Sequence, residues 1–418
     1  MDTLFRCCAG LDVHKDTVVA CARRLDGAGK VHKEVRTFGT MTCQLLALSD
    51  WLADFGVTHV AMELTGVYCK PVFHVLEGRF QVLLVNAYHI KQVPGRKTDV
   101  KDCDWIAQLL QHGLLKASFI PPAPIRELRD LTRQRAQLAG EKGQVANRVQ
   151  KVLEDANIKL GSVATDVLGE SGRDIIRALI AGETDPDKLA ELARKRLRAK
   201  IPSLRLALHG RVTPHHRFLL QLHRDHLESI ERLMDRLGER IGELMASYGE
   251  VAERLAEIPG VGPQAAEVVV AELGTDMTAF PTDARLTSWA GICPGNNESA
   301  GKHRSGRTPK GNRWLKRVLV QAAWGAAHSK DTYLAAQYRR LAARRGRKRA
   351  LVAVAHSLLV IIHHMLKEGT TFQELGADYL DQLSSERLTR QLERRLESLG
   401  HTVTLKPAGG PAPGEPEA

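Results

Sequence analysis

Four carboxylates near the start of the chain have the types and spacing needed to hold divalent cations. Asp12 ends one short apolar run and Glu63 ends another. Asp99 and Asp102 open a segment with helical spacing, and residues three apart share a helical face. An acid that follows buried strand residues is costly to bury alone and is therefore expected to take a cation. If they converge, the four carboxylates could hold two Mg²⁺ about 3.5–4 Å apart, which activates a nucleophile at a phosphodiester.

Each of these acids taken singly also fits a structural role. The two strand-end acids could cap turns, and the two helical acids could stabilise a helix N-terminus. The order of the surrounding strands and helices makes metal binding the favoured interpretation of the four together. Asp104 is expected to point away from this group, and His14 to be an exposed turn residue rather than a ligand.

Ser299 is a candidate nucleophile in the last third of the chain. It lies in a stretch with little side-chain bulk, Asn296-Asn297-Glu298-Ser299-Ala300-Gly301, which we expect to be a loop. A serine hydroxyl is a weak nucleophile unless a base or metal activates it and cations stabilise the attacked phosphate. From the residues alone, a serine that forms hydrogen bonds within a turn is the more common interpretation.

A strongly basic segment follows this serine. Between Gly301 and Ala350 there are 15 Lys or Arg residues and one acid, Asp331, a local surplus larger than the net charge of +12 of the whole chain. A merely solvated helix face would mix the signs of its charges. The segment therefore predicts a phosphate-binding face whose affinity falls with salt. The candidate contacts are Lys302, Arg304, Arg307, Lys310, Arg313, Lys316 and Arg317.

The stretch Ile258-Pro259-Gly260-Val261-Gly262 is typical of a helix-hairpin-helix turn. Gly260 and Gly262 would let the backbone approach a phosphate, and the next helix would offer free amides at its N-terminus. Such a contact would be independent of base sequence. An ordinary tight turn between two helices is the alternative.

The elements around the four acids predict an α/β domain of the RNase H-like (RuvC-like) type in residues 4–120. Three strands, a helix, a strand, a helix, a strand and a final helix follow one another, and Pro121-Pro122 ends the series. The expected strands are residues 7–13, 17–23, 33–38, 57–63 and 81–85, and two of the expected helices are residues 41–55 and 98–112.

The remainder of the chain is expected to be mainly helical. Residues 125–250 have apolar positions mostly three, four or seven apart, which predicts a long antiparallel hairpin or a dimeric coiled coil. Residues 252–376 form a C-terminal domain that contains the glycine turn and the serine. Residues 377–418 are an extension with a disordered tail rich in proline and glycine.

Bulk composition narrows the functional classes. The chain is 43% hydrophobic and 26% charged with a pI near 9.4, which indicates a soluble globular protein with a polyanionic partner. Aromatic residues make up only 5% of the chain, so the composition does not favour a protein that binds single strands through many stacked bases. No membrane span, signal peptide or Cys-x-x-Cys pair is evident, which favours a reducing cytoplasm.

Together these motifs resemble the insertion-sequence transposases that combine a DEDD RuvC-like domain with a C-terminal serine domain (insertion-sequence family one-hundred-and-ten). The resemblance covers about residues 8–375. Its most specific parts are residues 10–13, 63–66, 97–102, 258–262 and 293–313. The four acidic positions of the family motif fall on Asp12, Glu63, Asp99 and Asp102, and its serine falls on Ser299.

The resemblance implies that the chain excises and inserts its own element through a circular intermediate and a covalent phosphoserine link. The site would be completed between the protomers of a homodimer, and two dimers would form a tetramer in the prokaryotic nucleoid. A structured non-coding RNA, the bridge RNA, would pair with target and donor DNA while the protein reads backbone and shape. Glu298 stands beside the serine where some relatives carry smaller or aromatic residues.

Two other functions stay open at this point. A structure-specific endonuclease would use the same carboxylates with water as the nucleophile, and Ser299 would take no part. A non-catalytic nucleic-acid-binding protein would use the acids only to hold its fold together.

Overall fold

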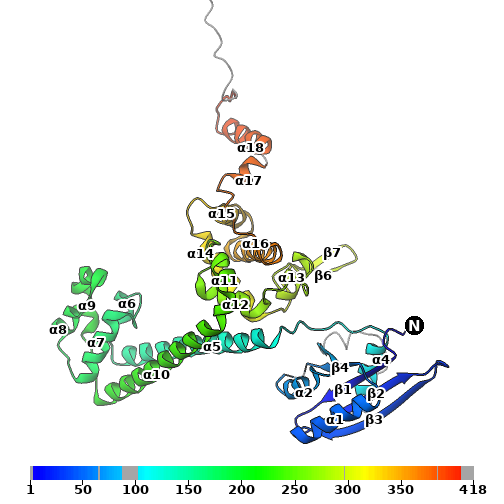
Figure 1. Ribbon diagram of the computed structural model, residues 1–418. Coiled ribbons are helices and arrows are strands. Elements are labelled where there is room, and N and C mark those ends of the chain that lie inside the picture. Colours follow the sequence, from blue (N-terminus) through cyan, green and yellow to red (C-terminus); the bar gives the residue numbers. More distant parts are fainter. Residues whose placement is uncertain (1–2, 65, 87–101, 296, 384, 406–418) are drawn as a thin grey trace, which may run out of the picture. The chain divides into compact units, whose positions relative to one another are not determined.

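The computed structural model describes residues 3–64, 66–86, 102–295, 297–383 and 385–405 (Figure 1). Contacts between residues divide the chain into two compact units, Met1–Ile120 and Pro121–Ala418. We call them unit 1 and unit 2.

Unit 1 is built on a mixed sheet of five strands in the order β3-β2-β1-β4-β5. The first three strands are antiparallel, whereas β1, β4 and β5 run parallel to one another. The central strand β1 is almost wholly buried, which explains why its sequence reads as a continuous apolar run. The strands are β1 (Cys7–Val13), β2 (Thr17–Leu25), β3 (Val31–Gly39), β4 (His59–Glu63) and β5 (Gln81–Val85).

Helices cover both faces of this sheet. On one face, α1 (Thr42–Asp54) and α2 (Cys69–Leu76) pack against alternate strand residues such as Leu11 and Met62. On the other face, α4 (Asp102–Gln111) packs against Cys8 and Ala61. Because successive strand residues point to opposite faces, the two helical layers bury different residues of the same strands.

The predicted order of strands and helices in unit 1 is confirmed, whereas several ends differ. Strands β2 and β3 pair with each other over their full length and are both longer than expected. Most residues of β3 are exposed, so its ends are not marked by alternating apolar residues in the sequence. Helix α4 is described from Asp102, and residues 98–101 of the expected helix lie outside the described residues.

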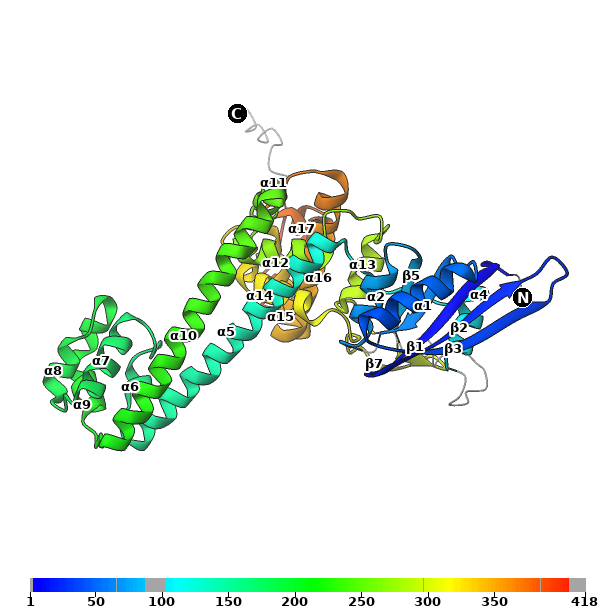
Figure 2. The ribbon, with the colours of Figure 1, turned by 60° about the horizontal axis from the view of Figure 1, so that its bottom comes forward.

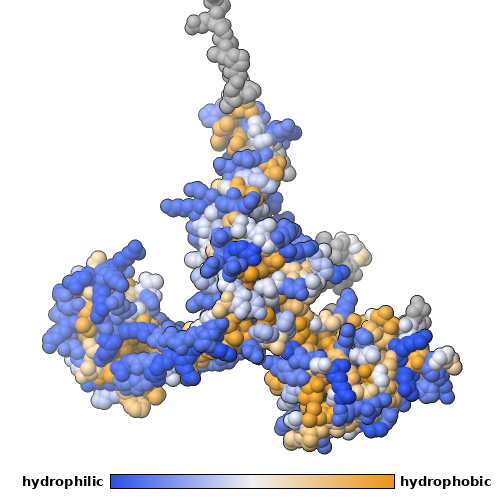
Figure 3. Space-filling view, viewed as in Figure 1, coloured by the Kyte–Doolittle hydropathy of each residue, from blue (hydrophilic) through white to orange (hydrophobic). Residues whose placement is uncertain are grey.

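Unit 2 contains a long helical hairpin that we call the arm. Helices α5 (Ala123–Asp155) and α10 (Pro214–Met245) lie side by side and antiparallel (Figures 1 and 2). Their apolar stripes meet in one core. The visible surface of the arm is accordingly mainly hydrophilic (Figure 3). Of the two arrangements that the sequence left open, the chain thus forms a hairpin with itself.

Short helices join the far ends of α5 and α10. They pack on the same core as the long helices, around residues such as Leu160 and Leu189. The elements are α6 (Leu160–Val163), α7 (Glu170–Ala181), α8 (Pro186–Glu191), the 3-10 helix η2 (Lys195–Lys200) and α9 (Ile201–Leu208).

The rest of unit 2 is helical except for one two-stranded hairpin, as far as the described residues show. Its central helix α16 packs against α13, α14 and α15. The elements are η3 (Ala246–Tyr248), α11 (Gly249–Ala256), α12 (Pro263–Leu273), α13 (Asp283–Ala290), β6 (Asn297–Ser299), β7 (Lys302–Ser305), α14 (Arg313–Ala327), α15 (Tyr333–Arg345), α16 (Arg347–Glu368), α17 (Tyr379–Gln382) and α18 (Ser385–Glu397).

Helix α16 is the one helix among the described residues that is long and apolar enough to cross a membrane by length and composition. Leu358, Leu359 and Ile362 are fully buried within unit 2. The imidazole of His363 is also buried, with Nε2 2.8 Å from the backbone oxygen of Phe280. These contacts are those of a core helix.

Candidate active site

Asp12 and Glu63 occupy neighbouring positions at the carboxyl ends of two parallel strands. Strands β1 and β4 pair with Gly10 opposite Ala61 and Leu11 opposite Met62, and the two acids are the next residue of each strand. Strand alternation directs both carboxylates to the face that α4 covers. Each acid is half-buried. Two acids that lie 51 positions apart in the sequence are therefore brought together by the register of the sheet.

Gly10 allows α4 to cross this edge of the sheet closely. A Cβ atom on Gly10 would lie 2.3 Å from the backbone oxygen of Cys103 and 2.4 Å from the backbone nitrogen of Ala107. Only glycine fits such an approach of strand to helix backbone. Asp102 is the first residue of α4 and directly precedes Cys103. The helix thus begins beside the strand that carries Asp12.

Three of the four predicted ligand positions are placed by the structure. Asp12, Glu63 and Asp102 belong to elements that meet at one edge of the sheet, whereas Asp99 lies outside the described residues. Within the described residues, no three His, Cys, Asp or Glu side chains are gathered tightly enough to hold a metal ion. The donor chemistry of the paired acids nevertheless fits a hard divalent cation, which prefers carboxylate oxygens.

His14 lies in the turn after β1, next to Asp12. Its Nε2 is 3.2 Å from Oδ2 of Asp12, and its side chain is largely exposed whereas that of Asp12 is 23% exposed. His14 is thus an exposed turn residue that contacts one of the candidate ligand acids.

Asp104 points away from the candidate ligands and binds basic residues of the outer strands. It forms ion pairs with Arg23 of β2 and with Lys33 of β3, the latter at 2.8 Å. Burial alone would raise the pKa of Asp104, but the hydrogen bonds from Lys33 and Arg23 lower it below its usual value. Its role is therefore to fix α4 to the sheet.

Ser299 is the last residue of β6 in the hairpin of unit 2, so the expected loop is an ordered turn of two strands. Ser299 pairs with Lys302, and the two residues between them, Ala300 and Gly301, have φ angles of 52° and 72°. Two central residues with positive φ are typical of a type I′ turn. The backbone position of the serine is therefore set by a tight hairpin.

Close glycine contacts hold the base of this hairpin. A Cβ atom on Gly311 would lie 2.4 Å from the backbone nitrogen of Gly291, and one on Gly295 would lie 2.3 Å from the backbone oxygen of Arg307. The two chain segments that lead into and out of the hairpin therefore pack backbone against backbone.

Lys316 was expected to contact phosphate, but its ammonium group is used within the protein. Its Nζ donates to the backbone oxygen of Gly291 at 2.8 Å and to Oγ1 of Thr308 at 2.7 Å. The residue joins the two sides of the hairpin base. Nothing is described of the Arg304 side chain, and the other expected phosphate contacts are exposed, namely Lys302, Arg307, Lys310, Arg313 and Arg317.

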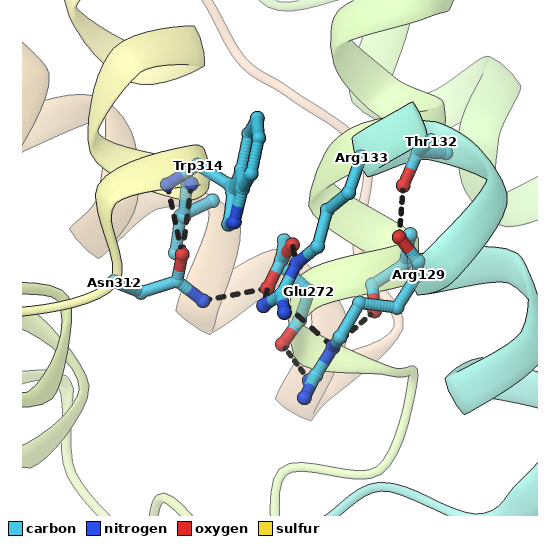
Figure 4. A network of polar contacts seen from close by, with 8 residues as sticks. Arg129, Thr132, Arg133, Glu272, Asn312 and Trp314 are labelled. Atoms are coloured by element: carbon cyan, nitrogen blue, oxygen red, sulfur yellow. Dashed lines mark hydrogen bonds and ion pairs between the residues drawn. The ribbon is translucent and has the colours of Figure 1, made fainter. Parts of the chain in front are cut away.

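A buried carboxylate, Glu272, connects the hairpin base to the arm (Figure 4). Glu272 is 0% exposed and accepts hydrogen bonds from Nε and Nη2 of Arg133, both at 2.7 Å, and from Nδ2 of Asn312 at 2.6 Å. The Oδ1 atom of Asn312 in turn caps the N-terminus of α14 by accepting from two backbone amides. Sequence reasoning missed this network, although an acid inside the apolar run of α12 is a signal that a cation must be near.

Arg129 completes the network from the arm. Its Nη2 donates to the backbone oxygen of Glu272 at 2.7 Å, and its Nε donates to that of Ala271 at 3.1 Å. Burial lowers the pKa of Arg129 to about 10, although the Glu272 carboxylate opposes the shift. The guanidinium remains charged at neutral pH.

The predicted glycine turn lies between α11 and α12, and its two glycines differ in role. Gly260 has a φ of +87°, and a Cβ atom there would lie 2.1 Å from the backbone oxygen of Ala322 in α14. Gly262 precedes α12, and a Cβ atom there would have open space within 4 Å. The conformation of Gly260 is thus required by packing, and Gly262 faces solvent.

Two family models match the chain. A DEDD transposase model matches residues 9–158, which include Asp12, Glu63 and Asp102. A model described as transposase IS116/IS110/IS902 family matches residues 252–339, which include the Ser299 hairpin and Asn312.

Two proteins are similar to parts of the chain. An uncharacterized 43.6 kDa protein of insertion element IS110 from Streptomyces coelicolor is 31% identical over 120 residues, which cover 28% of this chain and 29% of the relative. A protein of Sinorhizobium fredii named as a transposase is 28% identical over 161 residues, 37% of this chain and 41% of the relative. Each alignment spans less than half of the relative. The two transposase models together match more than half of the chain, which therefore belongs to the IS116/IS110/IS902 family of transposases.

Proposed function

We propose that this chain is a DNA transposase that excises and inserts an insertion sequence by metal-assisted phosphodiester transfer with Ser299 as the nucleophile. The observation that carries the proposal is the carboxylate edge of unit 1. Asp12 and Glu63 follow the last paired residues of adjacent parallel strands, and the helix that begins at Asp102 crosses the same strands. A RuvC-like nuclease domain needs such a group of acids.

The acids would bind the divalent cations of the reaction. Asp12, Glu63 and Asp102, together with Asp99, would hold Mg²⁺, two ions per site. Bound there, the ions would stabilise the charge that develops on the attacked phosphate and on the leaving oxygen. Asp104 would take no part, because its carboxylate already has two basic partners.

Ser299 would supply the covalent step. Its Oγ attacks the phosphorus and loses its proton, a serine phosphodiester forms, and the bond from phosphorus to the leaving deoxyribose oxygen breaks as that oxygen gains a proton. A hydroxyl group of the second DNA strand then attacks the same phosphorus and releases the serine. Lys302, which pairs with Ser299 in the hairpin, and Arg307, which follows the hairpin, are both exposed and would stabilise the phosphate charge.

The partners follow from the family resemblance and the basic segment. Arg304, Lys310, Arg313 and Arg317 would bind DNA backbone, with the amides near Gly262 as a further phosphate contact. A structured bridge RNA would select target and donor by base pairing. The acids and the serine would be combined between the protomers of a homodimer, and two dimers would act as a tetramer.

The decisive experiment is a search for a covalent adduct between protein and DNA. The protein, purified with RNA transcribed from the flanks of its gene, is incubated with labelled element-end DNA and Mg²⁺ and analysed under denaturing conditions. We expect an adduct with the wild-type protein that is absent from Ser299→Ala and from Asp12→Asn. Ser305→Ala is the matched control, because Ser305 belongs to the same hairpin and is exposed.

The same carboxylate edge would also suit an endonuclease that activates water, since it lies entirely in unit 1. That function predicts cleavage without an adduct and an active Ser299→Ala protein. A non-catalytic binding protein predicts instead that Asp12→Asn leaves transposition in cells unchanged. Either result would refute the proposed role of Ser299 or of the acids.

A further inference from the structure

The solvent-facing side of α14 has a composition unlike that of an ordinary helix surface. At about 100° per residue, the exposed residues of this helix fall within an arc of about 80°, opposite the buried Leu319, Ala322 and Ala326. We call this surface the outer face of α14, and it consists of Arg313, Arg317, Gln321 and Trp324 together with His328, the residue that directly follows the helix.

Trp324 is the unusual member of this face. It is 60% exposed, and its ring is tilted by 38° against that of His328, with the centroids 4.3 Å apart. The Nδ1 atom of His328 lies 2.7 Å from the backbone oxygen of Trp324, which fixes the imidazole. A single exposed apolar side chain is common and needs no partner. Here, however, two aromatic rings are held together at the surface.

The charges around Trp324 favour a polyanionic partner over an apolar protein surface. Arg313 and Arg317 lie on the same face, toward the start of the helix. No acid lies between Gly301 and Lys330, and Asp331 is the single acid up to Ala350. Aromatic rings interspersed with arginines are typical of proteins that stack nucleic-acid bases while binding the phosphates.

The glycine turn lies directly against α14 beside Trp324. A Cβ atom on Gly325, the next residue, would lie 3.2 Å from the Cα of Gly260. Gly262 of the same turn is exposed, with open space where a side chain would be. Backbone amides that can approach a phosphate and an exposed pair of aromatic rings therefore occupy adjoining parts of one surface.

We propose that the outer face of α14 binds a DNA strand that contains an unpaired base, with Trp324 stacked on that base and the two arginines on the flanking phosphates. The face is about 22 Å long, from 1.5 Å per residue, which matches roughly six base-pair steps. The choice of DNA over RNA rests on the proposed function. Helix α14 begins at the Asn312 cap, directly after the base of the Ser299 hairpin, so the strand that it holds is the strand to be exchanged.

Stacking on an exposed ring should discriminate between unpaired and paired bases. The face of a base is accessible in a single strand or an internal loop, whereas in a continuous duplex it is covered by its neighbours. The stacking contribution of one base corresponds to a loss of about 5- to 150-fold in affinity when the aromatic residue is removed. The arginines should contribute to both kinds of DNA, because phosphate contacts do not depend on pairing.

The test measures binding of the full-length protein by fluorescence anisotropy in EDTA, where no strand cleavage interferes. The probes are a short oligodeoxythymidine, a duplex with an internal thymine loop and the fully paired duplex. For Trp324→Ala we expect a loss of about 5- to 150-fold on the first two probes and less than about twofold on the third. Trp324→Phe should stay within about threefold of wild type, because a smaller ring still stacks.

The matched control is Phe218→Ala, which removes an aromatic side chain of similar exposure, 66%, from α10 of the arm. It should leave binding to all three probes unchanged. Equal losses on paired and unpaired DNA, or unchanged binding by Trp324→Ala, would overturn the inference. If Trp324→Ala changes the sedimentation of the protein but not its DNA binding, the outer face contacts protein and the inference is wrong. Tighter binding of the RNA strand of the same sequence than of the DNA strand would also overturn it.

This outcome is independent of the test of the proposed function. DNA binding in EDTA needs neither the metal-binding acids nor Ser299. If Trp324→Ala binds normally while the wild-type protein forms the Ser299-dependent adduct, the role of the outer face is wrong and the transposase mechanism stands. If the adduct is missing while Trp324 still discriminates unpaired bases, the transposase mechanism is wrong and the role of the outer face stands.

Discussion

The two units each contain an acidic centre, and the centres differ in what has been built around the carboxylates. In unit 2, Glu272 is fully buried and receives three hydrogen bonds from Arg133 and Asn312. In the described part of unit 1, the basic group that we find on Asp12 is one exposed imidazole, that of His14. A buried carboxylate that is paired with arginines of the same chain has a structural role, whereas a pair of carboxylates at the ends of two strands has oxygens that can bind a metal ion.

The same contrast recurs within a single helix. Asp104 lies two residues after Asp102 in α4, and its carboxylate binds Arg23 and Lys33. Asp104 therefore offers a control that shares the charge and partial burial of the candidate ligands and lies on the same helix as Asp102.

The largest effect is expected from Asp12→Asn. The substitution keeps the side-chain shape but removes the charge needed for a divalent cation, so DNA strand transfer should fall by about 1000-fold or more. Thermal unfolding should change little, because the basic group that we find on Asp12 in the described part of unit 1 is the largely exposed imidazole of His14. Strand transfer in vitro with Mg²⁺ and a melting curve of the same preparation measure the two quantities.

Asp104→Asn is the matched variant and should behave in the opposite way. The substitution removes the carboxylate partner of Arg23, whose side chain is only 11% exposed, so the melting temperature should fall. Strand transfer should stay within about tenfold of wild type. An Asp104→Asn protein that melts normally but is inactive would show that the distinction between structural and metal-binding acids is misplaced.

Glu272→Gln should cause the largest loss of stability. Breaking an ion pair on a buried group by removing one partner costs about 3–5 kcal/mol, and here Arg129 (13% exposed) and Arg133 (31% exposed) would both lose the charge that opposes theirs. Unfolding in urea measures this loss. The control is Glu267→Gln on the same helix, which pairs with Arg135 at 2.5 Å but is partly exposed and should cost about 1 kcal/mol or less. Equal losses from the two variants would contradict the role given to burial.

Gly10→Ala should lower the stability of unit 1 by an amount between the losses expected for Glu267→Gln and for Glu272→Gln. The new methyl group would meet backbone atoms of Cys103 and Ala107, which cannot move as a flexible side chain would. Overpacking of this kind costs about 1–3 kcal/mol, and the displaced helix would carry Asp102 away from the sheet edge. Both the melting temperature and strand transfer should fall. Gly27→Ala, with nothing within 4 Å of the added atom, is the control that should change neither.

Much of unit 1 could be predicted from the sequence because its signals are local. Apolar runs with an acid at the end of β1 and β4 indicate both the strands and the positions of Asp12 and Glu63. The register that makes these two acids neighbours follows once the strands are paired. The closeness of α4 could also have been inferred from Gly10, a glycine inside a buried strand.

The network of unit 2 could not be predicted in this way because its partners are far apart in the sequence. Arg133 and Glu272 are separated by 139 positions, and no periodic pattern connects them. Lys316 shows the reverse difficulty. Its sequence surroundings are uniformly basic and predict a phosphate contact, yet two oxygen acceptors of the hairpin base, on Gly291 and Thr308, take up its ammonium group.

The smallest effect is expected at Glu231, a third kind of acid, which has built-in partners but remains partly exposed. Arg173 and Lys142 bind its carboxylate, and the hydrogen bonds from Arg173, opposed by burial, lower its pKa to about 2. A lowered carboxyl pKa adds stability above the unfolded-state value near 4.3, and this is lost as the pH falls toward 2. After screening by solvent, the stability of the arm should decline by about 1 kcal/mol over that interval. Glu231→Gln should remove this part of the pH dependence, and urea unfolding at pH 6 and pH 3 compares the two proteins. If the variant keeps the full wild-type pH dependence, the ion pairs at Glu231 do not stabilise the arm, and built-in partners alone do not make an acid structural.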